Sequence, residues 1–154
     1  MKFALAVHGG AGTISKELMT SSREQAYHST LELALTRGQE ILSKGGAALD
    51  AVEVAVRVME DSPLFNAGRG SVFNADGQHE MDASLMNGSD LKAGAVAGVQ
   101  NVKNPIGLAR KVMDHSEHVL LSGNGAFEFA HKQRVELEDD QYFFDEFRYQ
   151  QWQE

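Results

Sequence analysis

A glycine-rich loop near the start of the sequence, His8-Gly9-Gly10-Ala11-Gly12, follows a short apolar stretch. Backbone N–H groups that such a loop exposes can bind a phosphate or another anion. The loop lacks the lysine of a Walker loop, and the next helix is predicted to begin only near Ser21, so a dinucleotide fingerprint also fails. An acyl-transfer site of the G-x-S-x-G type is excluded because the chain contains no such motif. The loop therefore indicates either an anion site or a structural turn.

A second candidate is the turn Pro63–Ser71, where an asparagine stands among apolar residues and glycines. The Asn66 side chain offers two hydrogen-bond donors and an acceptor, so it could hold a nucleophile or a substrate carbonyl. The same side chain could instead close the turn by hydrogen bonding to its own backbone. From these residues alone, both roles stay open.

The sequence shows no pattern typical of a metal site built from side chains. The six histidines are scattered, and none has a zinc spacing such as H-E-x-x-H. In the nearest cluster, His79 and Glu80 would point to opposite faces of a strand and could not chelate together. Cysteine is absent, which excludes disulfides and thiolate chemistry.

Acidic and aromatic residues are concentrated in residues 136–154. The formal net charge is −8, and this segment carries seven acids and one base, Arg148, which leaves −2 for residues 1–135. It also holds six of the twelve aromatic residues. Because no basic patch occurs, we expect no nucleic-acid partner. The segment indicates either a surface that packs on a partner or a solvated terminal helix.

The length of 154 residues fits a single domain with a proper core, which we assign to residues 1–154. The apolar run before His8 has only five residues. That is too short for a signal peptide or a membrane span, so we expect a cytoplasmic protein with no membrane partner.

The elements that must position the two candidate loops follow from the apolar pattern. Lys2–Val7 is predicted to be a buried first strand. A capping-box pattern at Ser21 and Ser22 predicts a helix that ends at Gly45-Gly46. A second, mostly buried helix is predicted over Ala47–Asp61, with its polar residues in one narrow stripe, and Pro63 prevents its continuation.

The second half of the chain alternates strand and helix signals. Three strands, joined at the hairpin signals Asp76-Gly77 and Asn87-Gly88, predict an antiparallel meander over Ser71–Asn74, Glu80–Asn87 and Leu91–Val99. A helix from Asn104-Pro105 to about His115, a short strand His118–Leu121 and a helix Gly123–Lys132 are predicted to follow. The fold class is therefore mixed α+β.

Five blocks of the sequence together resemble one known family. They are VHGGAG at Val7–Gly12, PLFNAGRGSVFN at Pro63–Asn74, EMDASLMNG at Glu80–Gly88, LKAGAVAGV at Leu91–Val99 and NPIGLARKVM at Asn104–Met113. In this order and spacing they are similar to the α-subunit of plant-type (type III) asparaginases and isoaspartyl peptidases. The resemblance runs from about Lys2 to His131 and is weaker after Gln133.

The resemblance implies a four-layer αββα N-terminal-nucleophile hydrolase, made as a precursor that cuts itself before a threonine. That threonine opens a separate β-subunit, and its free amine serves as the base for its own hydroxyl. The family hydrolyses L-asparagine and β-aspartyl (isoaspartyl) dipeptides and assembles as a dimer of αβ units. None of the four threonines here stands in the family's glycine-threonine-valine-glycine motif, so no catalytic residue is expected in this chain.

The resemblance assigns supporting roles to residues of this chain. Asn66 is implied to approach and fix the catalytic threonine, and the loop residues Gly9, Gly10, Ala11 and Gly12 are implied to lie beside the cleavage site. A structural sodium ion is implied, with no organic cofactor. It would be bound by the backbone carbonyls of Met59, Glu60, Ser62, Phe65, Ala67 and Arg69, and carbonyl oxygens suit a hard cation.

Three rivals remain. A subunit of an aspartylglucosaminidase-like hydrolase would normally show a signal peptide and cysteines, and this chain shows neither. The motifs at Val7–Gly12 and Asn66–Ser71 fit taspase-like proteases less well. A non-catalytic module that binds anions through His8–Gly12 would need no second chain.

Overall fold

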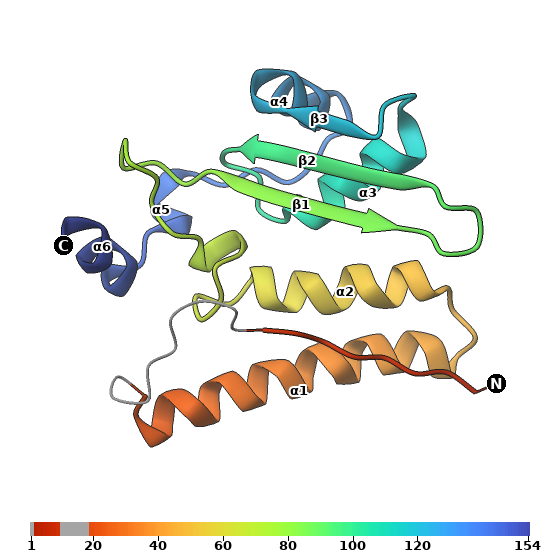
Figure 1. The fold of residues 1–154 in the computed structure, drawn as a ribbon, viewed down its shortest axis with the longest axis horizontal. Helices are drawn as coiled ribbons and strands as arrows, with labels where there is room; N and C mark the ends of the chain where they lie inside the picture. The colour runs from red at the N-terminus through yellow and green to blue at the C-terminus, as the bar shows by residue number, and fades with distance from the viewer. Residues whose placement is uncertain (1, 10–18) are drawn as a thin grey trace.

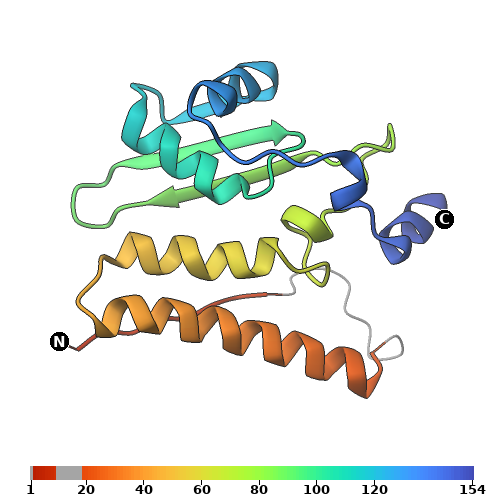
Figure 2. The same ribbon diagram turned by 180° about the vertical axis from the view of Figure 1, so that it is seen from behind.

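The computed structural model of the chain describes residues 2–9 and 19–154. Within this part, a pair of long helices lies on one side of a small three-stranded sheet, and two further helices pack with the sheet (Figure 1). Figure 2 shows the opposite side, where helix α3 crosses the two longer strands. A mixed α and β architecture is thereby confirmed. A four-layer αββα arrangement needs further layers, and it stays an expectation.

Helices α1 (Ser21–Ser43) and α2 (Ala48–Glu60) form an antiparallel pair (Figure 1). The Thr20 hydroxyl caps α1 by accepting a hydrogen bond from the Arg23 N–H, one residue before the predicted capping serines. Gly45, with φ +81°, ends the helix as the sequence predicted. The helices approach closely at Gly38, where an added Cβ atom would lie 3.1 Å from the Ala51 carbonyl oxygen.

The predicted first strand is wrong. Residues 2–9 form no strand in the structure; they run beside α1 (Figure 1). A strand requires hydrogen bonds to a neighbouring strand, and no described strand lies next to this segment. Its apolar residues are only partly covered, and the Phe3 side chain is 43% exposed.

Strands β1 (Met81–Met86) and β2 (Ala93–Val99) form the predicted antiparallel hairpin. The Asn87 N–H donates to the Lys92 carbonyl oxygen at 2.8 Å and closes the connection. The first strand of the predicted meander is wrong, because residues 71–74 form no strand. The short strand predicted at His118–Leu121 is present as β3 (Leu120–Ser122), which pairs parallel to β2. In residues 71–74 the backbone bonds locally: the Val72 N–H donates to the Asn66 side chain, and the Asn74 N–H to the Gln78 carbonyl.

Helices α3 (Pro105–His115) and α4 (Gly123–Lys132) confirm the two remaining helix predictions. Between the sheet and these helices lies a core of small and branched side chains. The C-terminal segment adds two short helices, α5 (Asp140–Phe143) and α6 (Glu146–Gln153). Of these, α5 places the fully buried Phe143 in the core, whereas α6 has no buried residue. The segment is thus partly core and partly surface.

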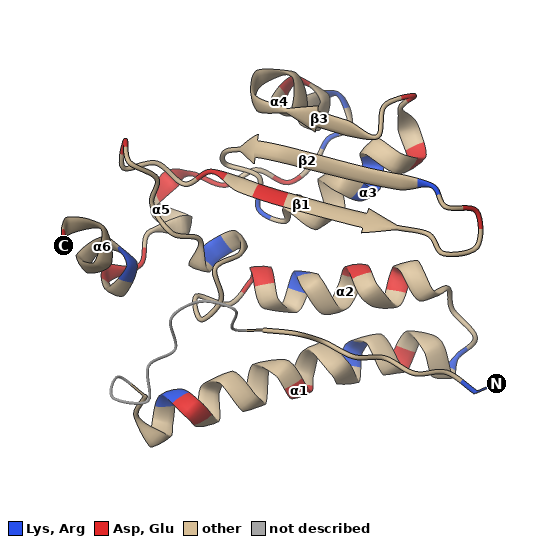
Figure 3. Ribbon diagram, viewed as in Figure 1, with Lys and Arg blue, Asp and Glu red and all other residues tan. Residues whose placement is uncertain are grey.

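Figure 3 shows Lys and Arg interspersed with Asp and Glu along the described chain, and no described α-helix or strand carries only basic residues among its charged ones. None of the helices among residues 2–9 and 19–154 combines the length and apolarity needed to cross a membrane.

Candidate functional site

The turn after α2 folds back on the end of that helix. The helix ends at Glu60, and a short 3-10 helix, η1 (Gly68–Gly70), follows within the turn. A Cβ atom on Gly68, which has φ +51°, would lie 2.7 Å from the Glu60 Cβ atom. A Cβ atom on Gly70 would lie 2.7 Å from the Pro63 carbonyl oxygen. Both glycines are therefore needed for the close packing of this turn.

Asn66 lies exposed on the same turn, and its side-chain oxygen accepts a hydrogen bond from the Val72 N–H at 2.9 Å. The turn-closing role that the sequence left open is therefore present in the structure. This bond uses only the oxygen of the amide. The Nδ2 group, which carries the two donors, is not part of it, so closing the turn is compatible with holding a further group.

Gly9, the first glycine of the glycine-rich loop, lies against this turn. A Cβ atom on Gly9 would lie 2.5 Å from Cε1 of Phe65 and 2.9 Å from Cδ2 of Leu31. The Phe65 ring is buried and packs edge-on against Tyr27 at 5.4 Å, and the Tyr27 hydroxyl donates to the Leu64 carbonyl at 2.8 Å. Gly9 and the Asn66 turn are thus neighbours. Gly10, Ala11 and Gly12 lie outside the described residues.

The six carbonyls implied to bind sodium all belong to the end of α2 and this turn: Met59, Glu60, Ser62, Phe65, Ala67 and Arg69. Three of them already accept one backbone hydrogen bond each, from the N–H groups of Ser62, Ala67 and Gly70. A carbonyl oxygen has two lone pairs, so these bonds leave a second acceptor position. The last carbonyls of a helix also lack helical partners and lie at the negative end of its dipole.

These properties fit a hard cation such as sodium, which prefers oxygen ligands. Side chains offer no competing site: among residues 2–9 and 19–154, no group of three or more His, Cys, Asp or Glu side chains could hold a metal ion. A cation in this turn would therefore depend on the backbone, and the side chains of Met59 and Arg69 would matter little.

The side chain of Glu60 is a feature that the sequence analysis missed. The polar stripe of α2 placed it toward solvent, yet it is only 2% exposed. Its Oε1 atom accepts a hydrogen bond from the Ile106 N–H at 2.9 Å, and its Oε2 atom has no partner among the described residues. Burial raises the pKa of Glu60 to about 7. The packing of α3 on α2, which a helical pattern does not reveal, causes this burial.

His79 is also buried, and its Nδ1 atom faces Ser71. Its Nδ1 atom lies 3.1 Å from the Ser71 carbonyl oxygen and 3.2 Å from the Ser71 hydroxyl. Burial lowers the pKa of His79 and so favours the neutral ring. Glu80 is exposed while His79 is buried, as expected for neighbours on opposite faces of an extended segment.

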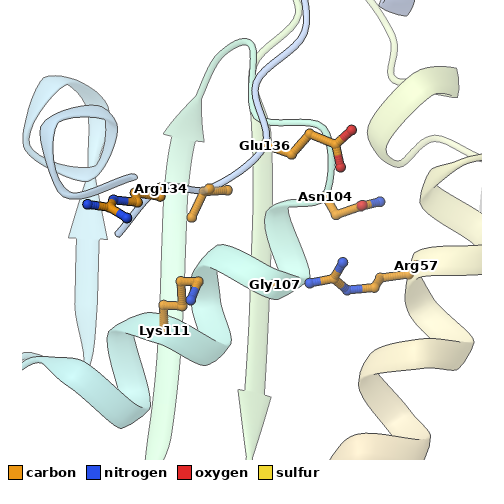
Figure 4. A pocket seen from close by; sticks show the side chains of 7 residues that line it. Arg57, Asn104, Gly107, Lys111, Arg134 and Glu136 are labelled. Atoms are coloured by element: carbon orange, nitrogen blue, oxygen red, sulfur yellow. The ribbon is translucent and has the colours of Figure 1, made fainter. Parts of the chain in front are cut away.

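A cavity of about 150 Å³ lies between α2, α3 and the segment before α5 (Figure 4). Of the predicted site residues that the structure describes, none lines it. Its lining includes three cationic side chains, Arg57, Lys111 and Arg134, and one carboxylate, Glu136. This excess of positive charge disfavours the binding of a cation. Arg57 already pairs with Glu53, at 2.9 Å from its Nη2 atom. The cavity is therefore separate from the Asn66 turn.

Comparison with known proteins decides the family. A family model described as asparaginase matches residues 1–154. The chain belongs to this asparaginase family. The family that the five sequence blocks indicated is thereby confirmed.

Several curated relatives of this asparaginase-family chain are closely similar. It is 56% identical over 127 residues to a plant-type L-asparaginase of Pyrococcus furiosus, and this match covers 82% of the chain and 40% of the relative. It is 46% identical over 150 residues to an isoaspartyl peptidase of Escherichia coli, and this match covers 97% of the chain and 47% of the relative. It is 47% identical over 135 residues to an isoaspartyl peptidase/L-asparaginase of Xenopus laevis, and this match covers 88% of the chain and 42% of the relative. The chain spans less than half the length of each of these relatives.

Proposed function

We propose that this chain is the α-subunit of a hydrolase that cleaves the side-chain amide of L-asparagine and the β-linked bond of isoaspartyl dipeptides. The observation that carries the proposal is the match of the asparaginase family model to residues 1–154, together with relatives named for both activities. The two substrates share one chemical unit, an amide on the β-carboxyl group of aspartate. A single site that recognises the aspartyl part can therefore act on both.

In this proposal the nucleophile is a threonine at the start of a β-subunit from the same precursor. The described threonines of this chain support that placement. Thr20 caps α1, and the Thr30 hydroxyl, within α1, donates to the Ala26 carbonyl at 2.9 Å. Thr36 is exposed in the same helix. Thr13 lies outside the described residues. A hydroxyl nucleophile needs an adjacent base, which the free amine of an N-terminal threonine would supply.

The contribution of this chain is then to position that threonine. The Asn66 oxygen is already held by the Val72 N–H, so the orientation of the whole amide is fixed before the partner arrives. Its Nδ2 group would donate to the threonine or to an oxyanion. Preorganised donors of this kind stabilise the charge that develops in acyl transfer. The Asn66 turn, braced by Gly9 and its own glycines, serves as the rigid support.

A sodium ion would complete this support through the six carbonyls of Met59–Arg69. It would bind carbonyl oxygens at the end of α2 and in the turn, and so stiffen the turn next to Asn66. The proposed role of the ion is structural, and it takes no part in bond cleavage.

Exposed apolar residues support the proposed partner chain. At the hairpin and β3, the side chains of Met86, Leu91, Val119 and Leu120 are each more than half exposed. In the described sheet, β1 and β3 each pair on one side only. A β-subunit with strands of its own would cover such edges and faces. We propose further that two αβ units assemble, as the resemblance implies.

The test is to produce the full-length protein that contains this chain and to measure ammonia release from L-asparagine and amino-acid release from a β-aspartyl dipeptide. We expect both activities, and intact-mass analysis should find a second chain that begins with threonine. A full-length protein that hydrolyses neither substrate, or that is never cleaved, would contradict the proposal.

A further inference from the structure

The C-terminal helix α6 lies against the Asn66 turn, although the two are far apart in the sequence. Figure 1 shows α6 beside the segment that leads from η1 to β1, away from the sheet. One polar contact joins them directly: the Arg148 Nε–H donates to the Gly70 carbonyl oxygen at 3.1 Å, in a partly buried position. Gly70 is the residue whose close packing against Pro63 holds the turn together.

Arg148 is itself held in place. Its backbone N–H donates to the Asp145 side chain at 3.1 Å, which caps α6, and its Nη1 atom donates to the Gln151 side chain at 3.0 Å. Because the backbone and the guanidinium of Arg148 each have a second partner, the side chain loses little freedom when its Nε–H binds the Gly70 carbonyl.

Aromatic contacts fix α6 to the segment after Gly70. The Trp152 ring lies 5.7 Å from the Phe73 ring, and an added Cβ atom on Gly77 would lie 3.0 Å from Trp152 Cη2. On the other side, the Arg23 guanidinium of α1 lies 4.1 Å above the Phe147 ring. The helix therefore bridges the start of α1 and the segment that follows the Asn66 turn. Such ring contacts add specific attraction to the burial of apolar surface.

The geometry links this contact to Asn66. Gly70 O accepts from Arg148, and two residues later the Val72 N–H donates to the Asn66 Oδ1 atom. Gly70 in turn donates its own N–H to the Ala67 carbonyl at 3.1 Å. A shift of Gly70 would therefore move both ends of the turn that presents Asn66.

We propose that Arg148 is a positioning residue, which clamps the Asn66 turn through Gly70 and so sets the orientation of the Asn66 amide for catalysis. The catalytic part of this proposal rests on the proposed function above. The clamp itself rests only on the contacts between α6 and the turn.

The test compares three variants of the full-length protein. Arg148→Met keeps the aliphatic stem and loses the donor, and Arg148→Lys keeps one donor that can reach a carbonyl. The matched control is Arg37→Met, which changes an exposed arginine of α1 whose only ion-pair partner in the described chain is Glu40, at 3.5 Å. The measurements are kcat and KM for L-asparagine and hydrogen exchange of the Val72 amide, which reports the bond to Asn66.

We expect Arg148→Met to lower kcat about tenfold and to leave KM within twofold, since small misplacements near a nucleophile cost up to about 10²-fold. Exchange of the Val72 amide should rise about tenfold. Arg148→Lys should recover most of both effects, and Arg37→Met should show neither. The difference in fluorescence between each protein and its Trp152→Phe version should show whether α6 stays docked.

Unchanged exchange at Val72 in Arg148→Met would overturn the clamp. Faster exchange with a normal kcat would overturn the positioning role. A parent protein without activity on either substrate would instead contradict the proposed function, and the exchange measurement would still decide whether Arg148 clamps the turn.

Discussion

The Oε1 atom of Glu60 accepts a hydrogen bond from the backbone N–H of Ile106 at 2.9 Å, so a carboxyl group at the end of α2 satisfies the first turn of α3. The N-terminal N–H groups of a helix lack helical partners, and an acceptor there stabilises the helix. Its Oε2 atom has no hydrogen-bond partner among the described residues, and burial of the carboxyl makes the charged form unfavourable. The Ile106 bond favours the charged form, but the effect of burial is larger, so the folded state is more stable when Glu60 is protonated.

The first prediction concerns stability and pH. Burial raises the pKa of Glu60 to about 7 from an ordinary 4.5, so the folded state binds the proton more tightly. The buried Glu60 does not destabilise the fold below pH 4.5, where it is protonated in both the folded and the unfolded chain. Its effect grows as the unfolded chain ionises and is complete above pH 7, where it lowers the free energy of unfolding by roughly 3 kcal/mol at most. Glu60→Gln imitates the protonated form and keeps the Ile106 bond.

We expect Glu60→Gln to match the parent near pH 4.5 and to be more stable above pH 7, as measured by urea unfolding of the full-length protein. Glu32→Gln, an exposed change on α1, is the control and should show no such trend. A variant that is less stable than the parent at pH 8 would show that the ionised carboxylate is a net stabiliser.

The second prediction tests the packing of the Asn66 turn. Gly70→Ala would place a Cβ atom 2.7 Å from the Pro63 carbonyl oxygen and still closer to the Phe65 carbonyl. Overpacking of this kind typically costs about 1–3 kcal/mol. Gly88→Ala is the matched control, because nothing lies within 4 Å of its added Cβ atom. Thermal unfolding should show a clear loss for Gly70→Ala and almost none for Gly88→Ala; equal losses would contradict the tight turn.

Sequence reasoning succeeded where the signal is local. The dipeptide Asn87-Gly88 predicts a hairpin turn and Asn104-Pro105 predicts the start of a helix, and the structure has both. It failed where an element depends on a distant partner. Lys2–Val7 has the composition of a strand but no described strand beside it, and the backbone of residues 71–74 bonds to the Asn66 side chain and to the turn at Gln78.

The candidate site shows the same division. Asn66 and the glycines around it stand out in the sequence because their types are unusual among apolar neighbours. Glu60 and Arg148 do not stand out, because their importance comes from contacts with Ile106 and Gly70, 46 and 78 positions away. Charged residues in a helix usually face solvent, and only the packed structure reveals these two exceptions.

A third prediction concerns the cation. If the carbonyls of Met59–Arg69 bind sodium, the melting temperature of the full-length protein should rise with sodium concentration when choline keeps the ionic strength constant. Above the dissociation constant, each tenfold increase in sodium should add about 1.4 kcal/mol. Arg69→Ala should keep this response, because only its carbonyl is involved. A melting temperature that does not depend on sodium concentration would contradict the proposed sodium site.

A fourth prediction separates the two roles of Asn66. Asn66→Asp keeps an oxygen for the Val72 N–H, so it should preserve the turn, but it replaces the Nδ2 donor by a negative charge. We expect kcat to fall about 10²-fold in this variant, with the melting temperature nearly unchanged. Asn66→Ala loses both functions and should reduce both quantities. If Asn66→Asp hydrolyses asparagine at the normal rate, Asn66 only closes the turn.

The last prediction concerns residues 1–154 produced alone. Apolar side chains at the hairpin and β3 are exposed, as is Phe3 in the unpaired segment 2–9, and the described sheet has two open edges. A partner chain must cover these surfaces if the proposed function is right, since open edges and apolar patches promote association. We therefore expect the isolated chain to aggregate or to remain partly unfolded, as measured by size-exclusion chromatography and near-ultraviolet circular dichroism, and to release no ammonia from asparagine. Co-expression with the β-subunit should restore a soluble, active complex. An isolated chain that is a folded monomer would show that these surfaces need no partner, and it would favour the self-sufficient anion-binding module over the hydrolase subunit.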